Sequence, residues 1–109
     1  MSVKFIPEIL AYFEELMIIL YEKGYFSFED SARKYVTELV SDIKGNLPTR
    51  LHKPAPKYFE IYGKNMKYAG FPKNRRTTWY VFFTTYCENG EEIFLIRYIA
   101  NNHTIAQYL

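Results

Sequence analysis

Lysine, arginine, tyrosine and histidine are the reactive side chains that this sequence gathers in its C-terminal half. It has no Gly-rich phosphate loop, no HExxH or GxSxG motif and no cluster with metal-ligand spacing. The carboxylate pairs Glu14-Glu15 and Glu91-Glu92 are neighbours in sequence, which is typical of solvated surface. Lys, Arg, Tyr and His can cleave RNA without a metal, because the 2′-hydroxyl is an internal nucleophile and the protein needs only to stabilise charge and transfer protons. The same side chains could instead bind nucleic acid without catalysis.

Charge is distributed unevenly along the chain. The net charge of all 109 residues is only +2, yet residues 44–76 contain nine basic side chains and one acidic one, a local net charge of +8. Residues 1–43 carry four basic and eight acidic side chains, which gives −4. A local basic excess indicates a polyanionic partner, and the alternative is a solvated loop that aids solubility. We favour the polyanion, because this segment leads directly into the predicted sheet.

The stretch from Arg75 to Ala100 predicts a β-hairpin. Two runs of aromatic and β-branched residues flank Asn89-Gly90. This dipeptide favours a type I′ turn, because both central residues of that turn need φ > 0. With Glu88 paired to Glu91, the predicted register places Phe83 opposite Ile96, Phe82 opposite Arg97 and Val81 opposite Tyr98.

Alternation of side chains assigns the hairpin residues to two faces. One face has Trp79, Val81, Phe83, Phe94, Ile96 and Tyr98, and the other has Tyr80, Phe82, Tyr86, Ile93, Leu95, Arg97 and Ile99. Arg97 is the only charged residue in either set. It could bind a phosphate beside aromatic rings. It could equally be paired with a carboxylate, or reach the sheet edge while its stem packs.

Two amphipathic helices precede the hairpin. Apolar residues recur at helical spacing from Ile9 to Leu20 and from Ala32 to Ile43. These two stripes are predicted to face the core. Pro7 suits the first position of the first helix and Gly24 its end. For the second helix, Ser27 and Asp30 resemble a capping box at the start, and Gly45-Asn46 marks the end.

The remaining segments complete an α+β pattern. Residues 2–6 alternate as a short strand, and the proline-rich stretch from Leu47 to Pro56 predicts a loop in which His52 is solvated. Lys57–Tyr62 alternates as a strand, and Met66–Phe71 resumes it after Gly63. The order β-α-α-β-β-β predicts a single domain over 1–109, with two N-terminal helices packed on a mainly antiparallel sheet.

Composition excludes several classes of protein. Cys87 is the only cysteine, so one chain can form neither a disulfide nor a Cys-based metal site. The N-terminal residues lack the pattern of a signal peptide, and no run of 18 apolar residues predicts a membrane span. We therefore expect a cytoplasmic protein that uses no metal or cofactor. Aromatic residues make up 19% of the chain, which suggests that some rings serve as contact surface.

The C-terminal half resembles the RelE/ParE superfamily of bacterial type II toxin–antitoxin systems. The resemblance rests on Lys64–Phe71, on RRTTWYVFF at Arg75–Phe83, on the ENG turn at Glu88–Gly90, and on FLIRYIANNHTIAQYL at Phe94–Leu109. The strand and helices before these segments follow the order of that family. The resemblance implies a RelE-like fold, a toxic activity in the bacterial cytoplasm, and a cognate antitoxin that wraps the surface of the toxin.

The resemblance also implies roles for individual residues. Members of this family carry basic residues on the second and third strands, an arginine on the last strand, and often a His or Tyr just after it. His103 lies later than the usual histidine, whose place Ala100 or Asn101 takes. The implied catalytic residues are Arg97, Arg75, Arg76, His103 and Tyr98, and the implied nucleic-acid-binding residues are Lys64, Lys67 and Lys73.

Three functions are compatible with this resemblance. The leading one is a ribosome-dependent mRNA endoribonuclease, in which Arg97 and one of Arg75 or Arg76 stabilise the scissile phosphate. His103 or Tyr98 would then transfer the proton, and we expect Arg97 to project into an open concavity toward the other cations. The second is a ParE-like inhibitor of DNA gyrase without catalysis, and the third is a non-toxic member that only binds a partner.

Overall fold

The two longest strands lie on either side of the Asn89-Gly90 turn in the sequence. The computed structural model of the chain describes residues 1–109 and contains strands β4 (Thr78–Glu88) and β5 (Glu91–Asn101). Asn89 and Gly90 have φ values of 52° and 77°, as a type I′ turn needs, and Glu88 pairs with Glu91. The predicted turn, and the register next to it, are confirmed.

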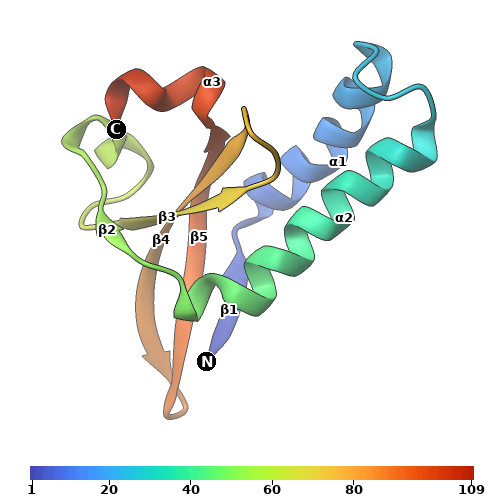
Figure 1. Ribbon diagram of the computed structural model, residues 1–109. Helices are drawn as coiled ribbons and strands as arrows, with labels where there is room; N and C mark the ends of the chain where they lie inside the picture. The colour runs from blue at the N-terminus through green and yellow to red at the C-terminus, as the bar shows by residue number, and fades with distance from the viewer.

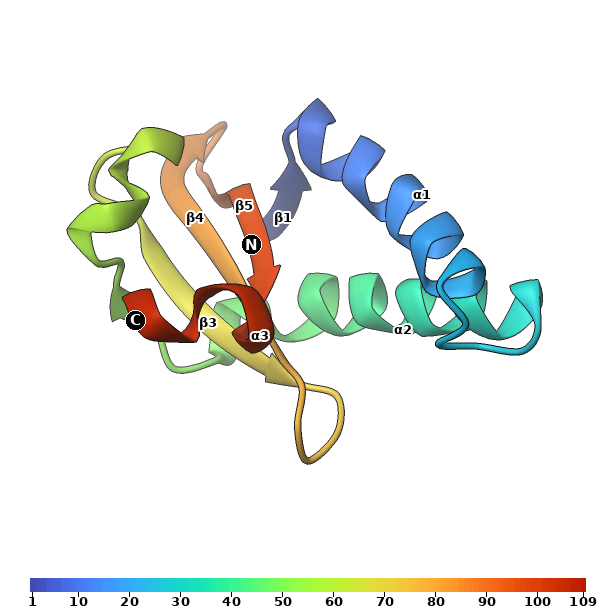
Figure 2. The same cartoon turned by 90° about the horizontal axis from the view of Figure 1, so that it is seen from above.

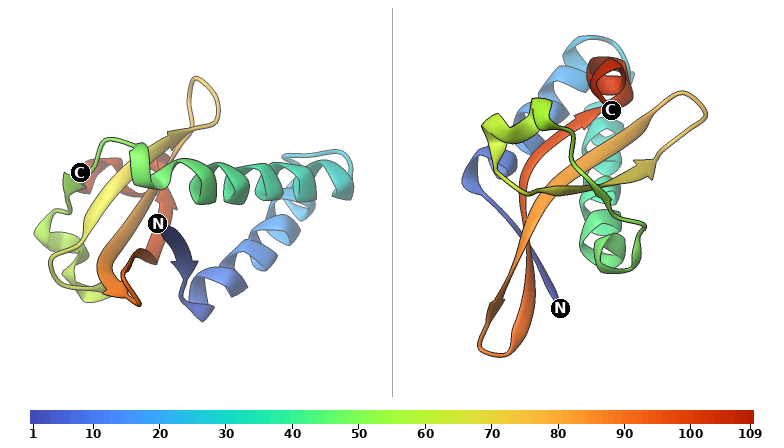
Figure 3. Two further views of the ribbon diagram at one scale, coloured as in Figure 1. Left: turned by 90° about the horizontal axis from the view of Figure 1, so that it is seen from below. Right: turned by 90° about the vertical axis from the view of Figure 1, so that its left-hand side faces the viewer.

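Three shorter strands extend this hairpin into a five-stranded sheet. They are β1 (Ser2–Phe5), β2 (Lys53–Pro54) and β3 (Lys67–Pro72), and the order across the sheet is β1-β5-β4-β3-β2. Strand β1 runs parallel to β5, and every other pair is antiparallel (Figures 1 and 3). The α+β class and the mainly antiparallel sheet are thus confirmed.

Two helices form a hairpin that covers one face of the sheet. Helices α1 (Pro7–Glu22) and α2 (Glu29–Asn46) meet beyond the sheet, where residues 23–28 join them (Figure 2). Their apolar stripes pack on β3, β4 and β5 in a core of fifteen buried residues, as predicted. Gly24 has φ 76° just past α1, which confirms its role in ending that helix. Neither helix is long and apolar enough to span a membrane.

The start of α2 differs from the prediction. The helix begins at Glu29, and its N-cap residue is Phe28, which has no side chain that can accept a hydrogen bond from the first turn. The predicted capping box of Ser27 and Asp30 therefore does not form. Glu29 and Asp30 place negative charge in the first turn instead, where it interacts favourably with the positive end of the helix dipole.

The predicted register fails beyond Phe83, because β5 contains a β-bulge. Phe83 pairs with Ile96 as predicted, but Phe82 pairs with Tyr98 and Val81 with Ile99. Arg97 is the extra residue between these pairs. The bulge reverses the faces of the residues that follow it, so Ile99 belongs to the helix-side core and Tyr98 packs on the opposite face.

Short helical turns, and not a strand, cover the second face of the sheet. Lys57–Tyr62 was predicted as a strand but forms a 3₁₀ helix, η2, so this prediction is wrong. The buried Phe59 explains the difference, because its ring stacks on Phe82 with 4.4 Å between centroids and thereby fixes the turn against the sheet. The C-terminal α3 (Asn102–Ile105) and η3 (Ala106–Tyr108) lie beside η2 and bury Ile105 in the same small core (Figure 1).

Candidate nucleic-acid interface

Arg97 occupies the bulge on the sheet face away from the helices. Its Nε donates a hydrogen bond to Thr84 Oγ1 at 3.0 Å. Thr84 follows Phe83 on β4 and points to the opposite side from that core residue, which confirms the predicted face of Arg97. Bulges commonly redirect a side chain at a functional site. Arg97 is the bulged residue of β5, and the hydrogen bond from its Nε to Thr84 holds its side chain against the sheet.

The terminal nitrogens of Arg97 have no carboxylate partner. None of the six ion pairs of the structure includes this residue, and its only side-chain hydrogen bond is the one to Thr84. Its aliphatic stem runs beneath Gly63, so that a Cβ at Gly63 would lie 2.9 Å from Arg97 Cδ. Of the alternatives for Arg97, pairing with a carboxylate is therefore excluded. The packed stem at the sheet edge agrees with the alternative of a side chain that reaches that edge. The guanidinium keeps two amino groups for a phosphate, which is the geometry that bidentate recognition requires.

A stacked pair of tyrosines adjoins Arg97. The rings of Tyr62 and Tyr98 are parallel within 7°, with centroids 3.8 Å apart. Burial raises the pKa of Tyr98 to about 12, and the neighbouring Tyr62 adds to the shift. The Tyr98 phenol is therefore protonated near neutral pH, where it can donate a proton or a hydrogen bond but cannot act as a base.

Arg97 and this tyrosine pair line one hollow at the edge of the sheet. Its volume is about 580 Å³, and α1 and α3 form its far side. Glu8 lies on that side, too far from Arg97 for an ion pair. The hollow exists because β1 pairs only with the first part of β5, through Phe5 and Ile96, and leaves the edge of β5 from Arg97 to Asn101 open.

Two of the three predicted lysines, Lys64 and Lys67, differ in their position relative to Arg97. Lys64 follows Gly63 in the loop above Arg97 and is exposed. Lys67 begins β3 and pairs with Phe83, whose ring lies in the helix-side core. Paired residues point to the same face, so Lys67 is directed away from Arg97. Of the predicted backbone-binding lysines, Lys64 has the better position.

The loop that holds Arg75 and Arg76 lies beside His103 at the far end of the sheet. Asn74 Oδ1 accepts hydrogen bonds at 2.9 Å from the backbone N–H groups of Arg76 and Thr77, which shapes the β3–β4 loop. His103 Nε2 lies 3.0 Å from Thr77 Oγ1, which ties α3 to this loop. The five residue-to-residue steps from Thr78 to Phe83 along β4 separate the loop from the level of Arg97 by about 17 Å.

This separation corrects the expected convergence of cations. The structure brings Arg97 and Tyr98 together, and Lys64 follows the glycine that contacts the Arg97 stem. It places the loop of Arg75 and Arg76, with His103, at the other end of β4. His103 therefore cannot reach a phosphate that Arg97 binds. Tyr98 is the proton-transfer candidate that the geometry retains.

Two further basic side chains of the segment 44–76 are engaged in packing. Lys73 Nζ lies 5.0 Å from the centre of the Tyr35 ring and 3.9 Å from Glu38, on the helix side of the sheet. Arg50 covers the ring of Phe71 at 4.7 Å and pairs with Asp42. Lys73 was predicted to bind nucleic acid, but these contacts direct it to α2, so we leave it out of the site.

His52 has a structural role that the sequence did not indicate. Its ring packs edge-on against Phe83 with 4.8 Å between centroids, and its Nε2 lies 2.7 Å from the carbonyl oxygen of Leu47. The prediction of a solvated loop histidine is therefore wrong. Such packing holds the proline-rich loop against the sheet and leaves no free imidazole there for catalysis.

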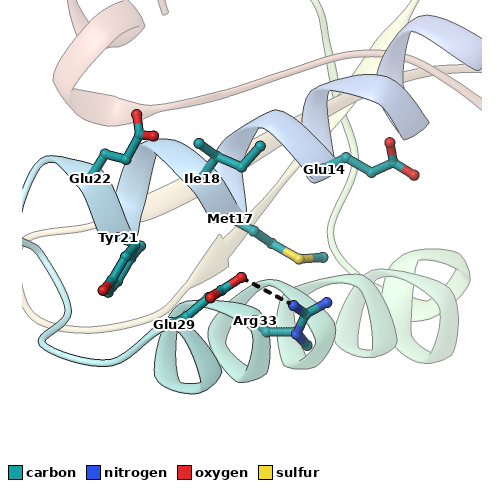
Figure 4. Close-up of a pocket in the computed structure, with 7 residues that line it drawn as sticks. All are labelled: Glu14, Met17, Ile18, Tyr21, Glu22, Glu29 and Arg33. Atoms are coloured by element: carbon teal, nitrogen blue, oxygen red, sulfur yellow. Dashed lines mark ion pairs between the residues drawn. The ribbon is translucent and has the colours of Figure 1, made fainter.

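The largest hollow of the molecule does not fit a polyanion. It lies between the two helices, measures about 660 Å³ and is shown in Figure 4. Three of its lining residues are acidic, and Arg33, its only basic residue, pairs with Glu29 at 3.5 Å. The full lining is Glu14, Met17, Ile18, Tyr21, Glu22, Glu29 and Arg33. Elsewhere, too, no group of three or more His, Cys, Asp and Glu side chains is placed to hold a metal ion.

Sequence reasoning missed the aromatic part of the site. Tyr58 and Tyr62 lie on η2 and stack on Tyr108 and Tyr98 respectively. The signals were the aromatic content of 19% and the two tyrosines four residues apart in KYFEIY. Read as a strand, that segment would have placed both rings on one face of the sheet, without the stacking partners from β5 and the C-terminus.

Comparisons of this chain with protein-family models, with curated proteins and with solved structures find no match. The most distinctive feature of the site is Arg97, which has no carboxylate partner and lies beside the Tyr62–Tyr98 pair.

Proposed function

We propose that this protein is the toxin of a bacterial type II toxin–antitoxin system, a RelE-like endoribonuclease that cleaves mRNA on the ribosome without a metal ion. The observation that carries the proposal is Arg97. An arginine that is held in a bulge by Thr84, has no carboxylate partner and adjoins a protonated tyrosine is suited to a phosphate undergoing displacement.

The proposed reaction is an internal phosphoryl transfer. The 2′-oxygen of the RNA attacks the adjacent phosphorus and releases its proton to water, and the bond from phosphorus to the 5′-oxygen breaks. Arg97 stabilises the negative charge that develops on the phosphoryl oxygens, and Tyr98 gives its proton to the leaving 5′-oxygen. The products are a 2′,3′-cyclic phosphate and a 5′-hydroxyl end. Lys64, in the loop above Arg97, contacts the neighbouring backbone phosphate.

The partners follow from the same proposal. The toxin would act on mRNA in the ribosomal A site, and a cognate antitoxin would neutralise it by covering this surface. The basic excess of residues 44–76 supports a polyanionic partner. The cytoplasm, where ribosomes are, is the proposed location.

A second candidate is binding without catalysis, as in a gyrase inhibitor or a non-toxic relative. The observation that favours it is the distance of Arg75, Arg76 and His103 from Arg97, because the full catalytic set implied by the family resemblance is then not assembled. A DNA supercoiling assay with purified gyrase tests whether the protein is a gyrase inhibitor. Normal growth of cells that express the protein would support a non-toxic relative.

Arg97→Ala tests the leading proposal. Induced expression of the wild-type protein should arrest growth, and primer extension on a translated mRNA should reveal new 5′ ends. Arg97→Ala should abolish both effects and leave the protein folded with at most a small fall in melting temperature, because the residue has no ion pair to lose and only one side-chain hydrogen bond. Arg97→Lys should restore little activity, since an ammonium lacks the bidentate fork.

Two controls keep this test decisive. Arg33→Ala removes an exposed arginine from the helical hairpin, away from the proposed site, and should leave cleavage intact. Thr84→Val removes only the hydroxyl that holds Arg97, and it should reduce cleavage without abolishing it. Undiminished cleavage by folded Arg97→Ala would refute the proposed role of this residue.

A further inference from the structure

Two parallel pairs of tyrosine rings lie side by side on the face that bears Arg97. Tyr62 stacks on Tyr98, and Tyr58 stacks on Tyr108 with 3.7 Å between centroids and 4° between planes. Tyr58 and Tyr62 both belong to η2, so one short element carries a ring of each pair. We call these four residues the tyrosine platform.

Packing alone does not explain why three of these four rings are exposed to solvent. Phe59, between them on η2, is fully buried and already anchors the turn on Phe82. Tyr58 is 50% exposed, Tyr62 36% and Tyr108 37%. Aromatic pairs in proteins prefer offset-stacked or edge-to-face contacts with centroids about 4.5–7 Å apart. Both pairs of the platform are instead nearly parallel with centroids 3.7 and 3.8 Å apart, close to a face-to-face stack.

The charges around the tyrosine platform indicate which class of ligand it can bind. Lys57 begins η2, Lys64 follows its end by two residues, and Arg97 adjoins Tyr98. Glu60 is the only acidic residue in the segment 44–76, and it forms no ion pair. A surface that combines flat aromatic faces with a net positive backbone-binding rim is the arrangement by which proteins hold single-stranded nucleic acid.

We propose that the tyrosine platform binds unpaired bases of single-stranded RNA, while Lys57, Lys64 and Arg97 bind the phosphates beside them. The inference deepens the proposed function, on which it rests, by naming the substrate as a single strand with splayed bases. Stacking on a ring face does not distinguish one base from another, so the platform adds affinity with little sequence preference. A duplex keeps its bases stacked inside and cannot use the platform.

The test separates binding from cleavage. The probe is a fluorescently labelled 2′-O-methyl oligouridine of twelve nucleotides, which lacks the nucleophilic hydroxyl, and the readout is fluorescence anisotropy with the full-length protein. Single-stranded probe should bind at least about tenfold more tightly than a 2′-O-methyl duplex of the same length. Tyr62→Leu and Tyr58→Leu should each weaken single-strand binding about tenfold and leave duplex binding unchanged.

Matched variants identify stacking as the cause. Tyr62→Phe keeps the ring and should retain wild-type affinity. Tyr25→Leu removes a tyrosine that is 70% exposed on the helical hairpin, and it should have no effect. If Tyr62→Leu melts early, Tyr108→Leu at the C-terminus removes a ring of the other pair with less risk to the fold.

Each outcome has a defined meaning. Equal binding of single strand and duplex, or no loss in the leucine variants, would overturn the platform. The same conclusion would follow if the probe failed to bind while an acidic peptide bound through these tyrosines, because the face would then be a protein interface. If the probe binds through the tyrosine rings but unmodified mRNA is not cleaved, the result would support the tyrosine platform and refute only the proposed endoribonuclease activity.

Discussion

Gly63→Ala is the sharpest steric test of the site. A Cβ at this position would lie 2.9 Å from Arg97 Cδ and 3.2 Å from Met66 Sδ. Favourable contacts between carbon atoms have separations of about 3.5–4.0 Å, so the methyl group overlaps the Arg97 stem by roughly 0.6 Å. Gly63 has φ 161° and ψ 144°, an extended conformation that any residue adopts. The effect is therefore steric and not a matter of backbone strain.

The expected cost in stability is moderate, and the expected effect on function is large. Overpacking of this kind destabilises by about 1–3 kcal/mol, and displacement of Arg97 also breaks its hydrogen bond to Thr84, which contributes about 1 kcal/mol. Urea unfolding followed by circular dichroism measures the sum. Because the displaced side chain is the proposed phosphate ligand, mRNA cleavage should fall at least tenfold at a temperature where the variant remains folded.

Gly45→Ala is the matched control. Gly45 lies inside α2, and a Cβ there meets no atom within 4 Å. Alanine at a helical position should stabilise the protein by about 0.5–1 kcal/mol and leave cleavage unchanged. The steric argument is refuted if Gly63→Ala unfolds at the wild-type urea concentration and cleaves at the wild-type rate.

Three further predictions concern the turn, the buried phenol and the basic segment. Gly90→Val should destabilise the protein by about 1–3 kcal/mol in thermal unfolding, because φ is 77° there and valine is strained at that value; an unchanged midpoint would contradict the turn type. The folded-state pKa of Tyr98 is about 12 against an ordinary 10.0, so its stabilising effect is complete below about pH 10 and lost as pH rises toward 12; Tyr98→Phe should remove this part of the alkaline destabilisation. Affinity for single-stranded RNA should fall with salt with a log–log slope of roughly −0.7 per phosphate neutralised, and a salt-independent affinity would argue against an electrostatic role for residues 44–76.

Local sequence signals predicted the elements whose structure is decided locally. The Asn-Gly turn specified both its own φ values and the register next to it, because few other dipeptides tolerate two positive φ angles. The apolar stripes of the helices identified the buried residues Phe13, Val36 and Leu39 correctly, since helical spacing places them on one face. The end of α1 was also predicted correctly, because Gly24 adopts the positive φ that commonly ends a helix.

Tertiary packing decided the elements that the sequence misassigned. KYFEIY alternates like a strand, but it has no neighbouring strand to pair with, and Phe59 contributes more by stacking on Phe82. His52 was assigned to solvent because a proline-rich loop normally follows the surface. The loop instead folds back, so that His52 fills the space beside Phe83. Neither contact leaves a periodic signature in the sequence.

The bulge has the greatest consequence for function, and no residue pattern indicated it. In a regular strand, Arg97 and Tyr98 would point to opposite faces of the sheet, as alternation requires. The extra residue in β5 allows Ile96 and Ile99 to remain in the helix-side core while Arg97 and Tyr98 are both directed to the other face and reach the hollow at the sheet edge. A cation for the phosphate and a phenol for the leaving oxygen thus become neighbours in space because they are neighbours in sequence. The proposed chemistry depends on this irregularity, whereas the core would be satisfied by any apolar residue at position 99.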